Sequence, residues 1–334
     1  MTLVRRVAPA VLLAVLAPLV AEFLLGDFTI RSIGLLLIFL PQYGGGAILV
    51  RELARRTGRG WPTILLLALA YGLIEEGLTT QSLFNPNYVG QHLLAYGYIP
   101  ALRTSLDWCV YVLSLHVVWS ISTPILIAEG VSGDRRRTPW LGRIGLAVVA
   151  ILFVLGCVIT IAVTLVSERP PFVAAPGELA AVVVLAALAV AAAFVLFRRR
   201  QPGSMPAGRA GALMPPAAGI ASLVLASALQ LVEQKARPLP AALPVVLMLA
   251  CWAVALVLLA IFTRRPGWGP RCWSAVAAGT VLTYGWLSLS HFLAGYSNVG
   301  GRTGPVDIAG QVVLLLIVLA LIAWGVLRSR PATA

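Results

Sequence analysis

Long apolar stretches alternate with short polar segments along the whole chain. A helix that crosses a bilayer needs about 20 mostly apolar residues, and the sequence contains ten such stretches. They cover residues 7–25, 33–50, 61–83, 106–128, 144–166, 178–197, 213–232, 241–263, 273–295 and 308–327. The pattern predicts an all-α fold: a polytopic membrane protein with about ten transmembrane helices in one bundle.

Hydrophobic residues dominate the composition. Of the 334 residues, 60% are hydrophobic and 11% are charged, whereas a soluble domain carries about 25% charged residues. The net charge of +13 comes from basic residues in short blocks between the apolar stretches, which does not suggest a nucleic-acid surface. We therefore expect the lipid bilayer as a partner and no nucleic acid.

The basic residues are distributed unevenly between the two sides of the predicted bundle. The ten stretches place 19 of the 25 basic residues on the side of the N-terminus and six on the other side. Cytoplasmic loops of membrane proteins carry an excess of Lys and Arg. We therefore expect a multi-pass protein of the cell membrane with both termini in the cytoplasm.

The segment 198–212, "RRRQPGSMPAGRAGA", is rich in proline, glycine and arginine. Such a composition is typical of a mobile connector, and we interpret it as a link between two five-helix halves. The chain is expected to form a single integral membrane domain over residues 1–334, with possible halves 1–166 and 178–334.

Two adjacent glutamates, Glu75 and Glu76, interrupt the third apolar stretch. A carboxylate near the bilayer centre costs several kcal/mol unless it faces protein or water, so it suggests a functional site. The next stretch carries His116 at mid-depth, the ninth carries His291 nearer its outer end, and the first carries Glu22 near its outer end. These positions predict one polar chamber in the outer half of the bundle.

Glutamate and histidine in one chamber favour acid–base chemistry. A glutamate beside a histidine can take a proton from water and later return it. The two residue types also bind zinc, but the sequence lacks the H-E-x-x-H spacing. We therefore expect no metal and no cofactor, and the lack of a Walker loop argues against ATP-driven chemistry within this chain.

Three short segments resemble the motifs of a known family. "YGLIEEGLTTQS" is similar to a motif with two glutamates followed by three residues and an arginine, although Thr80 stands at the arginine position. "YVLSLHVVWS" resembles a motif with an aromatic residue four positions before a histidine, where this chain has Val112. "LSLSHFLAGYSN" resembles a histidine followed four residues later by asparagine, where this chain has Gly295.

These segments resemble the CAAX-protease-and-bacteriocin-processing family of intramembrane glutamic proteases, chiefly over residues 61–128. The resemblance implies a membrane-embedded peptidase. Glu75 or Glu76 would activate water, and His116 and His291 would orient it and stabilise the oxyanion. The substrate would be a peptide or a small molecule within the membrane.

Two other functions remain open. A proton-coupled secondary transporter with a five-plus-five inverted repeat would use the glutamates and histidines as a proton relay. The segment "PQYGGG", Pro41–Gly46, predicts a helix break that is buried or lines a cavity, and "MPPAAG" in the seventh stretch would be its counterpart. The third possibility is a lipid-modifying enzyme whose site faces the outer leaflet.

Overall fold

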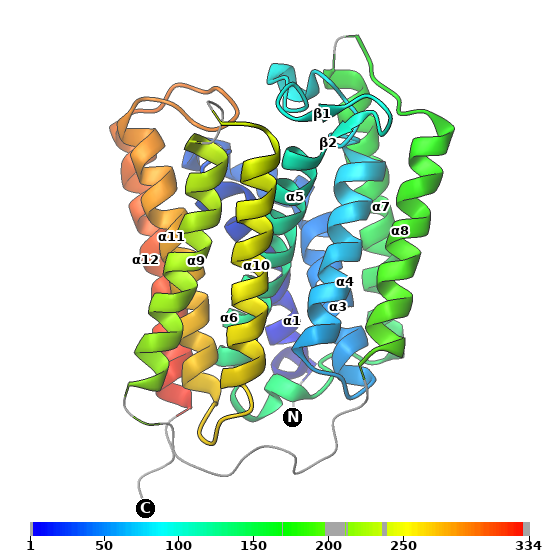
Figure 1. The fold of residues 1–334 in the computed structure, drawn as a ribbon. Helices are drawn as coiled ribbons and strands as arrows, with labels where there is room; N and C mark the ends of the chain where they lie inside the picture. Colours follow the sequence, from blue (N-terminus) through cyan, green and yellow to red (C-terminus); the bar gives the residue numbers. More distant parts are fainter. Residues whose placement is uncertain (1–2, 169, 198–210, 212, 236–238, 330–334) are drawn as a thin grey trace, which may run out of the picture.

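Ten long helical segments run alongside one another in one bundle (Figure 1). The computed structural model describes residues 3–168, 170–197, 211, 213–235 and 239–329. The segments are α1 with η1 (Leu3–Pro18, Leu19–Leu24); η2, α2, η3 and α3 (Ile30–Leu35, Leu36–Phe39, Leu40–Gly44, Gly45–Arg56); α4 with η4 (Trp61–Ile74, Glu75–Thr79); α5, η6 and α6 (Leu106–Leu115, His116–Ser122, Thr123–Val131); α7 (Arg143–Ser167); α8 (Pro176–Val195); α9 (Met214–Lys235); α10 (Ala242–Phe262); α11 (Pro270–Leu293); and α12 (Pro305–Arg328).

Each predicted stretch falls on one of these segments, so the chain is a helical, multi-pass membrane protein. Within the described residues, nine segments are both long enough and apolar enough to cross a membrane. The tenth, α11, has 24 residues but a more polar composition, so the count of ten spans stays a prediction. Helix α1 begins and α12 ends at the same end of the bundle (Figure 1). We call this the arginine-rich end and the opposite one the loop end.

The loop end carries the short elements between α4 and α5. These are the 3₁₀ turn η5 (Tyr88–Gly90) and a hairpin of β1 (Tyr98–Ile99) and β2 (Thr104–Ser105), in which Tyr98 pairs with Ser105. At the arginine-rich end, the 3₁₀ turn η7 (Gly133–Arg137) follows α6. The predicted connector lies almost wholly outside the described residues, and it follows α8, the sixth helix. It therefore does not separate five helices from five.

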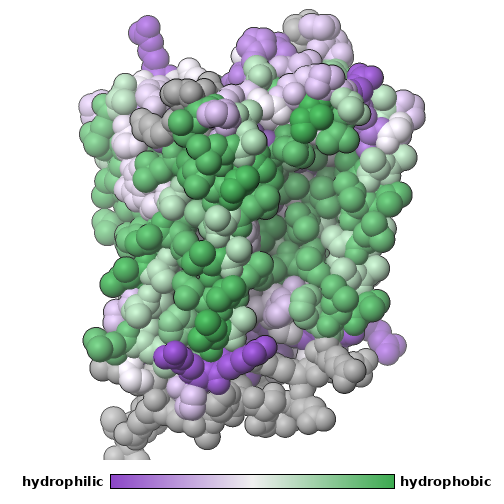
Figure 2. Space-filling model, viewed as in Figure 1, coloured by the Kyte–Doolittle hydropathy of each residue, from purple (hydrophilic) through white to green (hydrophobic). Residues whose placement is uncertain are grey.

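The helices divide into an inner group and a peripheral group. In the segment Leu106–Val131, 72% of the most apolar stretch is buried, against 6% in α7 and in α10. The peripheral helices present apolar side chains outward and form the hydrophobic belt in Figure 2. Polar side chains that need partners are therefore gathered on the inner helices.

A buried ion-pair network closes the arginine-rich end. The Arg51 guanidinium is fully buried, donates to Glu129 at 3.1 Å and to Glu52 at 2.6 Å, and lies 3.4 Å from the centre of the Trp140 ring. Arg55 forms two bonds of 2.7 Å to the same Glu129 carboxylate. Both acids are paired, as burial of a charge requires, and the network joins α3, α6 and the segment after η7.

The predicted helix break at Pro41–Gly46 is a π-helical turn instead. The helix continues from Ile30 to Arg56, and η3 lies within it. A Cβ atom added at Gly44 would lie 2.5 Å from the carbonyl oxygen of Ala14, and one at Gly46 would lie 2.3 Å from the Tyr71 ring. The glycines therefore allow close approach to α1 and α4. The proposed counterpart "MPPAAG" falls in the first turns of α9 and breaks no helix.

Candidate functional site

Four inner helices each contain a π-helical turn: η1, η3, η4 and η6. A π turn inserts an extra residue into a helix and is frequent at functional sites. These turns carry five polar residues, which are Glu22, Gln42, Glu75, Glu76 and His116. Segments far apart in sequence thus bring their polar side chains to a similar depth in the helix bundle.

Glu75, Glu76 and His116 form one buried cluster, here called the Glu–His cluster. Nε2 of His116 lies 2.6 Å from Oε1 of Glu76 and 3.1 Å from Oε2 of Glu75. The three residues are 3%, 7% and 4% exposed. Gly72 permits this approach, because a Cβ atom there would lie 3.0 Å from Cβ of His116.

The other nitrogen of the imidazole faces a hydroxyl. Nδ1 of His116 lies 3.1 Å from Oγ of Ser120, one turn further along η6. When Nε2 carries a proton and donates it to Glu76, Nδ1 accepts from the Ser120 hydroxyl. The chain Ser120–His116–Glu76 therefore orients the imidazole and provides a path for one proton.

Glu76 is held at its second oxygen by the loop that follows η4. The hydroxyl of Ser82 donates to Oε2 of Glu76, and the hydroxyl of Thr80 lies 3.3 Å from the same atom. The indole of Trp108 in turn donates to Oγ of Ser82 at 3.2 Å. Glu76 is therefore fixed from both sides, by His116 and by this loop.

Glu75 is held less completely than Glu76. Among the described residues, none makes a well-aligned hydrogen bond to Oε2 of Glu75, although Nε2 of His116 is near. The hydroxyl of Tyr71, one turn earlier in α4, is likewise buried without a partner in the described part of the chain. A carboxylate oxygen and a hydroxyl donor are thus available next to His116, where a water or a substrate oxygen could bind.

The same three residues also offer a set of metal ligands. One ligand atom from each of Glu75, Glu76 and His116 lies within 4.8 Å of the others. Two ligands of one zinc ion are about 3.3 Å apart in tetrahedral geometry, and the 2.6 Å between His116 and Glu76 is shorter. A metal would require these groups to separate, whereas a shared proton suits them as they are.

A cavity of about 620 Å³ lies on the loop-end side of the cluster. Trp108 forms part of its wall, and Trp108 is joined to Glu76 through Ser82. Asp27 and His291 also line the cavity. The polar chamber expected from the sequence is therefore divided into a closed cluster and an open cavity that share this wall.

His291 belongs to the cavity and has its own partners. Its Nδ1 lies 2.7 Å from Oδ1 of Asn298, and the Asn298 amide donates to Oδ1 of Asp27 at 2.9 Å. Burial raises the pKa of Asp27 to about 7, the hydrogen bond from Asn298 opposes this rise, and the charge of Glu76 adds to it. Asp27 therefore changes charge near neutral pH.

Sequence reasoning identified the three residues of the cluster but missed Ser82, Trp108 and Asp27. Ser82 reaches back to Glu76 because the helix ends at Thr79, whereas the predicted stretch continues to residue 83. Trp108 and Asp27 carried no comparable pattern, because interfacial tryptophans and loop aspartates are common in membrane proteins.

Fold and site together define a multi-pass helical membrane protein with a buried Glu–Glu–His cluster. The chain belongs to the family described as "Uncharacterized membrane protein family", whose model matches residues 11–329. No curated protein and no solved structure matches the chain.

This match corrects the resemblance to the CAAX-protease-and-bacteriocin-processing family. The family match covers nearly the whole chain, whereas that resemblance rested on three short motifs, each of which lacks a characteristic residue, at Thr80, Val112 and Gly295. Glutamate pairs and histidines at helical spacing recur wherever membrane helices gather polar groups. Such motifs therefore do not by themselves establish descent from those proteases.

Proposed function

We propose that the chain is a membrane-embedded hydrolase that activates water at the Glu–His cluster and cleaves a peptide or small molecule within the bilayer. One observation carries the proposal. Glu75 Oε2 is buried without a well-aligned hydrogen bond from any described residue, beside an imidazole already bonded to Glu76 and facing Ser120. A general base needs such an available oxygen and a neighbouring group that controls its proton.

The proposed reaction begins with a water molecule at Glu75. The carboxylate takes one proton while the water oxygen forms a bond to the carbonyl carbon of the substrate. The Tyr71 hydroxyl supplies a donor for the oxyanion, and the positive charge of protonated His116 stabilises it electrostatically. The proton then passes to the leaving nitrogen or oxygen as the scissile bond breaks, and the carboxylate is restored.

Substrate access is expected from the loop-end cavity. The cluster is closed, and the wall between cavity and cluster includes Trp108, whose indole is bonded to Ser82. Breaking that one hydrogen bond and turning the indole would connect the cavity with Glu76. Exclusion of bulk water by such a wall strengthens the electrostatic interactions inside.

Proton-coupled transport is a second candidate, favoured by the closure of the cluster itself. A proton-exchange site needs buried carboxylates and histidine but no room for a substrate bond to break. The inverted repeat stays a prediction, and the proposed relay uses the π turns and the cluster in the first half of the chain. Glu22, which interacts electrostatically with Tyr43, Glu75 and His116, would extend the relay.

The two candidates are separated by incubating protein-containing membranes in ¹⁸O-labelled water. A hydrolase places ¹⁸O in the carboxylates of peptide or lipid products, and Glu75→Gln should slow this by about 10²–10⁴-fold. The exposed Asp134→Asn variant is the matched control and should behave like the wild type. Equal labelling in Glu75→Gln contradicts the hydrolase. Proton uptake by sealed vesicles that needs Glu75, without labelled products, supports the transporter.

A further inference from the structure

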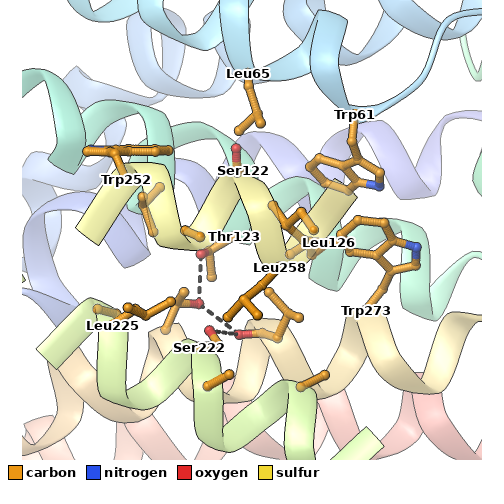
Figure 3. Close-up of a pocket in the computed structure, with 18 of the residues that line it drawn as sticks. Trp61, Leu65, Ser122, Thr123, Leu126, Ser222, Leu225, Trp252, Leu258 and Trp273 are labelled. Atoms are coloured by element: carbon orange, nitrogen blue, oxygen red, sulfur yellow. Dashed lines mark hydrogen bonds between the residues drawn. The ribbon is translucent and has the colours of Figure 1, made fainter. Parts of the chain in front are cut away.

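An apolar groove of about 170 Å³ opens between the inner helices and the pair α9–α10 (Figure 3). Helices α4, α6, α9, α10 and α11 contribute its walls, and three of its tryptophans are Trp61, Trp252 and Trp273. The space-filling view shows the hydrophobic belt hollowed between these two groups of helices (Figure 2). The groove is separate from the loop-end cavity, because the two share no lining residue.

The groove continues into a small basic pocket at the arginine-rich end. This pocket has a volume of about 40 Å³, and Trp61, Leu126 and Trp273 line both spaces. Its ionisable residues are three arginines and one glutamate: Arg55, Arg136, Arg137 and Glu129. Arg55 pairs with Glu129 through both carboxylate oxygens, and the three arginines outnumber the one glutamate, so the lining of the mouth is basic.

Two polar atoms in the groove lack partners within the described chain. Oγ of Ser122 and Nε1 of Trp268 are buried there without hydrogen bonds from the described residues. Ser122 is 8% exposed and Trp268 is 6% exposed. Other groove hydroxyls are satisfied: Thr123 bonds to Thr280 at 2.8 Å, as Figure 3 shows. A buried donor without a partner costs about 1–3 kcal/mol, so these two atoms point to a bound acceptor.

We propose that this groove binds one anionic phospholipid of the surrounding bilayer. The phosphate lies at Arg136, an ester carbonyl accepts from Trp268, and a segment of one acyl chain lies between Trp61 and Trp252. Basic residues at a membrane surface attract anionic lipid, and tryptophan is enriched at the level of lipid headgroups. A cavity of about 150 Å³ holds benzene, so the groove accommodates a segment of chain while the remainder stays in the bilayer.

The site is tested by native mass spectrometry of the protein released from nanodiscs that contain either phosphatidylglycerol or phosphatidylcholine. The wild type should retain one phosphatidylglycerol and little phosphatidylcholine. Arg136→Gln should lower phosphatidylglycerol retention about fivefold, and Arg302→Gln, at the loop end, should not. Ala255→Trp should fill the groove and abolish retention, whereas Val257→Trp, on the exposed face of the same helix, should not.

Arg136→Gln changes only the half-buried mouth, so it tests the site even where Ala255→Trp does not fold. Three results would overturn the proposal. They are equal retention of both lipids, unchanged retention in Arg136→Gln, and recovery of a free fatty acid in place of phospholipid. None of these readouts involves the Glu–His cluster, so the outcome is independent of the proposed hydrolase function.

Discussion

Nε2 of His116 lies 2.6 Å from Oε1 of Glu76, although 40 residues separate them in sequence. This contact joins η4 to η6 at a depth where neither side chain reaches bulk water. Because a hydrogen bond between a carboxylate and an imidazole is charge-assisted, it holds the two helices together as well as organising the site. Function and stability are therefore separable only by variants that leave this bond intact.

The loop after η4 should stabilise the site through Ser82. Ser82→Ala removes the donor to Glu76 and the acceptor for Trp108, and a buried polar group without a partner costs about 1–3 kcal/mol. We expect a lower Tm in detergent and a lower activity. Ser167→Ala is the control, since in the described part of the chain that exposed hydroxyl donates to carbonyls of its own helix. Equal Tm values for the two variants would show that Ser82 does not support Glu76.

Close packing at the π turn η3 should make Gly44 sensitive to substitution. Gly44→Ala places a Cβ atom 2.5 Å from the Ala14 carbonyl oxygen, and overpacking of this kind costs about 1–3 kcal/mol. Gly34→Ala, in the same transmembrane segment, meets no described atom within 4 Å. Thermal unfolding in detergent should show a clear loss for Gly44→Ala and almost none for Gly34→Ala. Similar losses of thermal stability at both positions would show that Gly44 has no special packing role.

Asp27 should make stability depend on pH. In the unfolded chain its carboxyl group ionises near the ordinary pKa of 3.8, whereas burial raises the pKa to about 7 in the folded protein. The folded state thus holds a proton that the unfolded state releases. This contribution to stability is complete below about pH 4 and is lost as the pH rises through 7.

Asp27→Asn removes that contribution. We expect its Tm to change less than that of the wild type between pH 4 and pH 7, and we expect Asp134→Asn, at an exposed position, to follow the wild type. Parallel curves for Asp27→Asn and the wild type would mean that Asp27 ionises normally in the folded protein.

Orientation in the membrane is open to direct labelling. Asp134 and Arg302 are both exposed, at the arginine-rich end and the loop end respectively. The excess of arginine predicts that the first of these ends faces the cytoplasm. A membrane-impermeant maleimide added to intact cells should label Arg302→Cys and leave Asp134→Cys unlabelled, with the wild type as background. Labelling of Asp134→Cys and not of Arg302→Cys would show that the arginine-rich end faces the outside of the cell.

The helices and the Glu–His cluster could be predicted from the sequence, whereas the details of the site could not. Apolar length alone located every helical segment, because backbone groups in lipid must be satisfied within a helix. Glu75, Glu76 and His116 could be grouped because consecutive, antiparallel helices joined by a loop pack together.

The π turns explain much of what the sequence did not reveal. On a regular helix Glu75 and Glu76 point about 100° apart, so both carboxylates would not face the same imidazole nitrogen. The wider turn of η4 brings both carboxylates to the same nitrogen. The position of His291 was also not predictable, since it depends on Asn298 and Asp27, which come from two separate loops.

The central claim is that Glu75 acts as a general base and does not merely hold neighbouring helices together. One variant tests this claim most directly. Glu75→Gln keeps the size of the side chain, leaves the His116–Glu76 bond in place and removes one of two crowded carboxylates. We predict that its Tm equals or exceeds that of the wild type, while incorporation of ¹⁸O from labelled water into products falls by at least about 10²-fold. A lower Tm together with an unchanged rate of ¹⁸O incorporation would contradict the account.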